Sequence, residues 1–145
     1  AKSVEPPTIP VGTADVFIAF KMPDCKSAPT KREYEALAAT TQDFYTKHLK
    51  GKFETFARVE VAVSQAYYGQ NKPDDRYDVY LEWDIKASFA ESAGPVPDRY
   101  QLCTSLVRNV DLKAYISEHL RMLKGTSFER TLGVFTEQVN RTINA

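Results

Sequence analysis

The side chains in this sequence that could carry out chemistry are few and scattered. His48 and His119 fall on different predicted helices, where a histidine more often packs or interacts with the helix end than it catalyses. Ser64 and Ser88 lie on predicted strands without the glycine pattern of a nucleophile elbow. The sequence also lacks a glycine-rich phosphate loop. We therefore predict that the chain is not an enzyme and that it binds no cofactor.

The carboxylates do not form a recognisable metal motif. Asp74, Asp75 and Asp78 lie close together, but they lack the glycine and the distal glutamate of an EF-hand loop. Glu82 and Asp84 share one face of a predicted strand, and nothing in the sequence places them around a cleft. No cysteine and histidine spacing supplies three or four converging ligands. We predict solvated acidic side chains and no metal site.

The cysteines and one asparagine bear on the cellular compartment. Cys25 and Cys103 are compatible with one disulfide, which needs Cα atoms within about 7 Å, or with two packed thiols. Asn140 begins Asn-Arg-Thr, which fits the N-glycosylation acceptor pattern. Together these features favour a secreted or lumenal protein, while a cytoplasmic location stays open.

Composition indicates one folded domain. The chain has 145 residues, 43% of them hydrophobic and 12% aromatic, which suits a globular core. Its 19 basic and 19 acidic side chains cancel, so no long-range charge attracts nucleic acid. No apolar run approaches the length of a membrane span. We expect protein partners, no nucleic acid and no direct membrane span.

Residues 77–89, YDVYLEWDIKASF, organise the predicted fold. Apolar residues occupy the odd positions and polar residues most of the even ones, which predicts a strand with one buried face. Trp83, at the middle of the apolar series, is expected to anchor the core. Thirteen extended residues span roughly 40 Å, so we expect a bend or bulge within this strand.

The remaining elements follow from periodicity and from residues that begin or end helices. Thr30 and Glu33 form a capping box at the start of an amphipathic helix, which we expect Gly51 to end. Asp111 is suited to begin a later helix that extends to Leu123. We predict a proline-rich arm in residues 1–12, strands in 13–22, 53–68 and 128–139, a hairpin loop in 69–76, a short helix in 98–108, one domain over 13–139, and a tail in 140–145.

The order strand, helix, strand, strand, helix, strand predicts the α+β class. The economical arrangement is a ferredoxin-like βαββαβ sandwich, with a four-stranded antiparallel sheet and both helices packed on one face. The first and third strands are then central, and these two carry the strongest alternation.

This order resembles the SEA domain, a ferredoxin-like module of extracellular and mucin-type proteins. The likeness covers roughly residues 13–139 and includes the long first helix, the long hairpin and the segment VDLKAYISEHL before the last strand. Self-cleaving members carry Gly-Ser at the start of the third strand, whereas this chain has DRYDV in residues 75–79. The resemblance therefore implies a non-cleaving member.

With both helices on one face, the other face of the sheet is open. The expected register brings Phe17 and Tyr80 side by side on neighbouring strands as an interaction patch. The alternatives are a cross-strand pair that only shields itself, or coverage by the proline-rich arm. The residues expected on this face are Phe17, Ala19, Arg58, Glu60, Tyr68, Tyr80, Glu82 and Asp84.

We expect a non-enzymatic interaction or structural module of a secreted or lumenal protein, or an accessory subunit of a larger assembly. An RRM-like domain that binds single-stranded nucleic acid shares the order of elements. The neutral charge and the lack of a basic, aromatic run on the third strand disfavour it. A small ligand-binding α+β protein is the other alternative, although a fold alone implies no activity.

Overall fold

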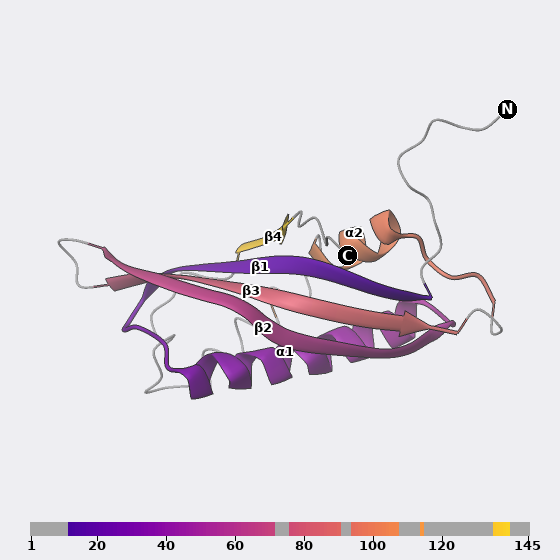
Figure 1. The fold of residues 1–145 in the computed structure, drawn as a ribbon, viewed down its shortest axis with the longest axis horizontal. Helices are drawn as coiled ribbons and strands as arrows, with labels where there is room; N and C mark the ends of the chain where they lie inside the picture. The colour runs from indigo at the N-terminus through magenta and orange to yellow at the C-terminus, as the bar shows by residue number, and fades with distance from the viewer. Residues whose placement is uncertain (1–11, 72–75, 91–93, 108–113, 115–134, 140–145) are drawn as a thin grey trace, which may run out of the picture.

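The described residues form a four-stranded antiparallel sheet and the helices α1 and α2, so the predicted α+β class is confirmed (Figure 1). The computed structural model describes residues 12–71, 76–90, 94–107, 114 and 135–139. Most of the predicted arm, most of the helix expected from Asp111, and the tail with Asn140 lie outside these residues. The elements are β1 (Thr13–Cys25), α1 (Lys31–Lys52), β2 (Phe56–Asn71), β3 (Arg76–Phe89), α2 (Arg99–Val107) and β4 (Phe135–Val139).

The strand order is β2-β3-β1-β4, so the prediction that the first and third strands are central is confirmed. All pairs are antiparallel, and Ile18 lies opposite Trp83 at the middle of the β1–β3 pair. The bend or bulge expected within β3 is wrong, because the irregularities lie in its partners. The register shifts between Met22 and Cys25 in β1, and between Phe56 and Arg58 and between Val63 and Gln65 in β2.

The start of α1 follows the sequence prediction, but its end does not. The Glu33 amide donates to Thr30 Oγ1 at 3.2 Å and the Thr30 amide donates to Glu33 Oε1 at 2.9 Å, so the capping box is confirmed. The predicted end at Gly51 is wrong, since the helix continues to Lys52. Extended Phe53 closes it by donating its amide to the Leu49 carbonyl at 2.8 Å. The Phe53 ring packs edge-on against Phe89 at 5.8 Å, which holds this end against the sheet.

The core lies between the sheet and the two helices. Trp83 is fully buried and packs edge-to-face against Phe20, with ring centroids 5.4 Å apart. The helices also contact each other on this side of the sheet, since Tyr45 Oη donates to the Leu106 carbonyl at 3.4 Å. α1 and α2 therefore lie on one side of the sheet, whereas the other helix of the predicted pair, which begins at Asp111, lies mostly outside the described residues. Other buried members of the core are Ile18, Met22, Leu37, Leu49, Leu81, Ile85 and Leu102.

The short helix predicted in residues 98–108 is confirmed as α2, which lies along β1 and β4. Arg99 Nη1 donates to the Asp15 carbonyl at 3.3 Å near the start of α2, and Thr136 Oγ1 donates to the Val107 carbonyl at 2.8 Å at its end. Asp15 is the third residue of β1, and Thr136 pairs with Phe20 near the middle of that strand. α2 therefore runs along the first half of β1.

The two cysteines are buried free thiols, so the disulfide alternative is wrong and the packing alternative holds. Cys25 is the last residue of β1, whereas Cys103 lies in α2, whose start contacts Asp15 near the first residues of that strand. Ten strand residues between Asp15 and Cys25 correspond to roughly 33 Å, so the two ends of β1 are far apart. Burial raises the pKa of the Cys103 thiol, although the Arg99 charge opposes this, and the raised pKa keeps the thiol protonated.

Truncation of Trp83 tests the central role of this side chain. We expect Trp83→Ala to lower the free energy of unfolding by about 3–5 kcal/mol, because a fully buried ring leaves a cavity. Trp83→Phe is the matched control. It keeps an aromatic ring against Phe20 and removes an indole N–H that has no hydrogen-bond partner among the described residues, so the loss of stability should be much smaller. Chemical denaturation measures both, and equal stability of Trp83→Ala and the unchanged protein would contradict the assignment.

Candidate binding surface on the open sheet face

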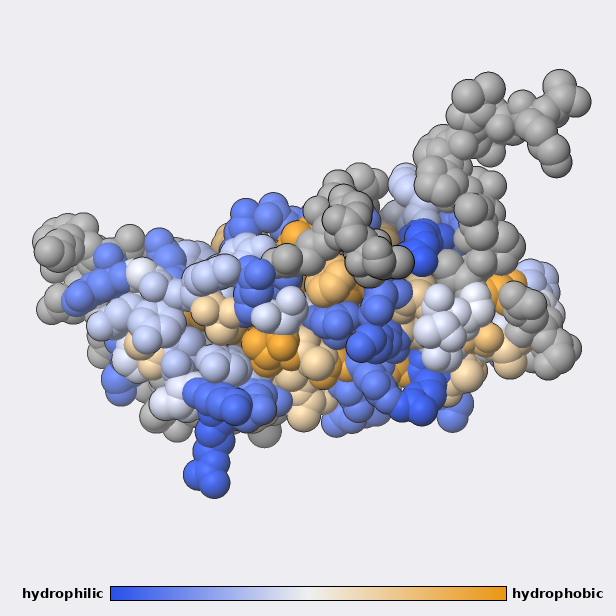
Figure 2. All heavy atoms as spheres, in the orientation of Figure 1, coloured by the Kyte–Doolittle hydropathy of each residue, from blue (hydrophilic) through white to orange (hydrophobic). Residues whose placement is uncertain are grey.

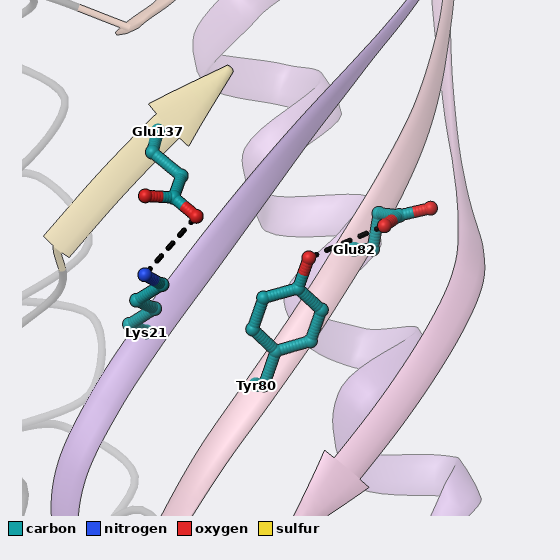
Figure 3. A network of polar contacts seen from close by, with 4 residues as sticks. All are labelled: Lys21, Tyr80, Glu82 and Glu137. Carbon is teal, nitrogen blue, oxygen red and sulfur yellow. Dashed lines mark hydrogen bonds and ion pairs between the residues drawn. The ribbon is translucent and has the colours of Figure 1, made fainter. Parts of the chain in front are cut away.

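The sheet face opposite the helices carries the candidate site. Figure 3 shows Lys21, Tyr80, Glu82 and Glu137 on the near side of the strands, with α1 behind the sheet. Alternation along the strands brings Phe17 and Arg58 to the same face, since Phe17 lies opposite Asp84 and Arg58 opposite Ser88. We call this surface the open face. Its central residues are Asp15, Phe17, Ala19 and Lys21 of β1 with Tyr80, Glu82, Asp84 and Lys86 of β3.

Tyr68 was expected on the open face, and this placement is wrong. The register shift between Val63 and Gln65 moves the alternation of β2 by one residue. Tyr68 therefore lies opposite Val79 and beside Tyr77, while Tyr67 takes the position opposite Tyr80. The signal in the sequence is Ser64-Gln65, two successive polar residues that interrupt the alternating valines.

The expected pair of Phe17 and Tyr80 is also wrong, although both residues lie on neighbouring strands. Phe17 is paired with Asp84, and Tyr80 is paired with Lys21, which is four residues from Phe17 along β1. Four strand residues correspond to roughly 13 Å, so the two rings are too far apart to touch. The aromatic neighbour of Tyr80 is Tyr67, with ring centroids 5.8 Å apart and planes tilted by 41°.

Glu82 is the most buried charged residue of the open face, with only 1% of its surface exposed. Its carboxylate accepts from Tyr80 Oη at 3.2 Å and from Ser64 Oγ at 3.1 Å. Figure 3 shows the Tyr80 hydroxyl pointing toward Glu82 along β3. Hydrogen bonds to a carboxylate are stronger than neutral ones. Glu82 therefore holds the Tyr80 ring in place and ties it to the irregular part of β2.

Asp15 and Asp84 form a second acidic feature beside Glu82. One buried carboxylate oxygen of each has no hydrogen-bond partner among the described atoms. Burial raises the pKa of Asp84, the Asp15 carboxyl beside it adds to the rise, and the Lys86 ammonium at 3.8 Å opposes it. The centre of the open face is thus acidic, and part of that charge is held at a cost to the folded state.

An apolar groove lies at the end of the open face near the β2–β3 hairpin, with a volume of about 430 Å³. Phe135, the first residue of β4, pairs with Lys21, and β1 continues beyond this pair to Cys25. The groove lies at this end of the β1–β4 pairing. Tyr67, Tyr68 and Phe135 each expose 56% of their surface there. We call this site the aromatic groove. Its lining residues are Lys21, Met22, Pro23, Tyr67, Tyr68, Gly69, Asp78, Val79, Tyr80 and Phe135.

Two polar contacts hold the walls of the aromatic groove. Asp24 has a positive φ of 60°, which an aspartate tolerates better than most residues, and its amide donates to Asp78 Oδ1 at 3.3 Å. This contact ties the irregular end of β1 to β3. On the other side, Lys21 Nζ lies 3.0 Å from Glu137 Oε1, which joins β1 to β4 (Figure 3). The rings of Tyr67 and Phe135, between these two contacts, are more than half exposed.

A second groove, of about 520 Å³, lies between α1 and the edge strand β2. It is more polar, and Gln42 Oε1 crosses it to accept from the Val61 amide at 2.9 Å. This bond occupies an edge-strand donor that would otherwise pair with an added strand. Figure 2 shows hydrophobic residues in the middle of the visible face, between hydrophilic ones. The aromatic groove has the more apolar lining of the two grooves, so it is the better candidate for a ligand.

The other residues that could carry out chemistry do not converge on either groove. His48 Nε2 and Ser105 Oγ are 3.2 Å apart, but Ser105 is only 5% exposed and His48 stacks on Phe44. The pair joins α1 to α2 inside the molecule. Within the described ranges, no group of three or more His, Cys, Asp or Glu side chains is placed to hold a metal ion. In the same part of the chain, no helix is both long and apolar enough to cross a membrane.

Comparisons of the chain with models of known families, with curated proteins and with solved structures found no match. The resemblance to the SEA domain therefore stays a prediction from the sequence pattern.

The raised pKa of Asp84 gives a pH dependence with a definite sign. The pKa of Asp84 is higher in the folded protein than in the unfolded chain, where it is about 4. The folded protein therefore loses stability as the pH rises from about 4 through the folded-state pKa, because ionisation of this carboxyl favours the unfolded chain. We expect Asp84→Asn to raise the melting temperature at neutral pH and to flatten its decline above about pH 4. Asp43→Asn, on the exposed surface of α1, is the control and should leave the profile unchanged. A lower melting temperature for Asp84→Asn at neutral pH would contradict the sign.

Proposed function

We propose that this chain is a non-enzymatic protein-interaction domain that binds its partner through the aromatic groove of the open face. The observation that carries the proposal is the pair of Tyr67 and Phe135, each 56% exposed, on the open face around an apolar groove that Tyr80 also lines. Aromatic side chains are enriched where proteins bind one another, and exposed clusters of them mark interaction sites. The ion pair of Lys21 with Glu137 and the Asp78 carboxylate supply the polar rim of such a site.

We further propose a ferredoxin-like, SEA-like architecture for the fold. The strand order β2-β3-β1-β4, with α1 and α2 on one face, supports the ferredoxin-like part. The long hairpin of β2 and β3 and the 22-residue helix α1 support the SEA-like part. The segment at residues 75–79 has no Gly-Ser, which supports a non-cleaving member.

A nucleic-acid-binding function of the RRM type has one observation in its favour, the neighbouring rings of Tyr67 and Tyr80 on the open face. The charge beside them disfavours it. Asp15, Glu82 and Asp84 lie on the same face, where carboxylates repel a phosphate backbone. We therefore favour a protein ligand.

A secreted or lumenal location is part of the proposal, and Asn140-Arg141-Thr142 supports it. The thiols of Cys25 and Cys103 are free, so they give no support for an oxidising compartment. The glycosylation motif is the feature on which this location rests.

Replacement of the exposed rings tests the binding surface. We expect Tyr67→Ser combined with Phe135→Ser to abolish recovery of partners from an extract of the native source, because both rings line the groove. The melting temperature should change little, since both side chains are more than half exposed. Partner recovery is measured by affinity capture and mass spectrometry.

Tyr100→Ser is the matched control, because Tyr100 is 64% exposed on α2 and does not line the groove. It should retain all partners. If the double variant keeps its partners while remaining folded, the aromatic groove is not the binding surface. If it binds single-stranded RNA less well than the unchanged protein, the RRM-like alternative replaces the proposal.

A further inference from the structure

The aromatic groove has the chemistry that recognises proline-rich segments. Such segments adopt the extended polyproline II helix, which makes no internal hydrogen bonds and docks on aromatic-lined grooves. Tyr67, Tyr80 and Phe135 lie on this face and offer flat rings for pyrrolidine packing, and Pro23 adds apolar surface. The groove also has one side chain of each charge, Lys21 and Asp78, at which a ligand with opposite charges finds partners.

This chain itself carries a segment of that kind. Residues 1–11 read AKSVEPPTIPV, with Pro6, Pro7 and Pro10. Glu5 is the one charged residue in residues 4–11, and its charge is opposite in sign to that of Lys21 in the groove. The segment leads directly into β1 at Gly12, whose carbonyl accepts from the Phe89 amide at 2.7 Å.

The prolines cannot reach the groove of their own chain. Gly12 and the groove residue Lys21 lie at opposite ends of β1, nine residues apart, which corresponds to roughly 30 Å. Pro6 is six residues before Gly12, so even a fully extended chain carries it at most about 22 Å. Pro7 and Pro10 are closer still to Gly12. Docking of these prolines on the aromatic groove therefore requires a second copy of the chain.

We propose that the aromatic groove binds the proline-rich segment at residues 4–11 of another copy of this chain. The inference rests on the proposed function and names the ligand of the same site. The donor segment joins β1 at Gly12, whereas the acceptor groove lies toward the other end of this strand. The contact between two copies is therefore heterologous, and repetition of this contact builds a head-to-tail array. Such an array is a structural role suited to a module that lacks a catalytic site among its described residues.

A labelled peptide with the sequence of residues 4–12, VEPPTIPVG, tests the pairing in trans with the full chain as receptor. Fluorescence anisotropy should show saturable binding to the unchanged protein and to Tyr100→Ser. The combined Tyr67→Ser and Phe135→Ser variant should bind at least about tenfold more weakly, because two exposed rings of the groove are removed. A peptide with alanine in place of all three prolines should bind as weakly.

Sedimentation velocity of the full chain provides the second measurement. Association should increase with protein concentration and should decrease when unlabelled peptide competes for the groove. Full chain with Pro6→Ala, Pro7→Ala and Pro10→Ala should sediment as a monomer, and its groove should still bind the peptide. Thr8→Ala, within the same segment, is the control and should associate normally.

The proposal is overturned by any of three results: no peptide binding, equal binding of the alanine peptide, or equal binding by the folded double variant. These results are distinguishable from failure of the proposed function. If the double variant loses its native partners but the unchanged protein does not bind the peptide, the groove binds another protein and only the identity of the ligand is wrong. If the peptide binds and the double variant keeps all native partners, the groove serves self-association and the proposed function for other partners is wrong.

Discussion

The antiparallel pairing of β1 with β3 is the constraint on which the rest of the structure depends. It places Ile18 opposite Trp83 and directs Phe20 into edge-to-face contact with the Trp83 ring, so the apolar series of both strands enter one core. Because successive strand residues point to opposite faces, the same pairing sends Asp15, Lys21 and Tyr80 to the open face. Burial on one side and the candidate site on the other are therefore two results of a single register.

Irregularities in β1 and β2, the two neighbours of β3, shape the candidate binding surface. In β2, the register shift near Ser64 places Tyr67 opposite Tyr80. The Glu82 carboxylate accepts hydrogen bonds from Ser64 of β2 and from Tyr80 of β3, so it links the two strands at this shift. In β1, Asp24 takes a left-handed conformation that the Asp78 carboxylate supports. Deviations from regular pairing frequently re-aim side chains near functional sites, and here they gather aromatic rings at one end of the sheet.

The open face combines two different environments. At its centre, Asp15 and Asp84 lie side by side, each with a buried carboxylate oxygen that has no hydrogen-bond partner among the described atoms, and burial disfavours ionisation of Asp84 by raising its pKa. At its end, the aromatic groove is apolar, and the Lys21 charge at its margin is paired with Glu137 of β4. The proposed proline-rich ligand suits both environments: its apolar rings fit the groove, and its low charge avoids repulsion by the acidic centre. Its extended backbone also loses little conformational freedom on binding.

The sequence by itself determined the α+β class, the central strands, the capping box at Thr30 and Glu33, and the burial of Trp83, because these features depend on local periodicity and on contacts between residues close in sequence. Only the tertiary structure decided the partner of Tyr80, the free state of Cys25 and Cys103, and the end of α1 beyond Gly51. Alternation indicates which residues share a face, but it does not reveal how far one strand slides along the next. A one-residue shift in β2 exchanges Tyr68 for Tyr67 without disturbing the apolar pattern of β3, so the groove became visible only once the strands were paired.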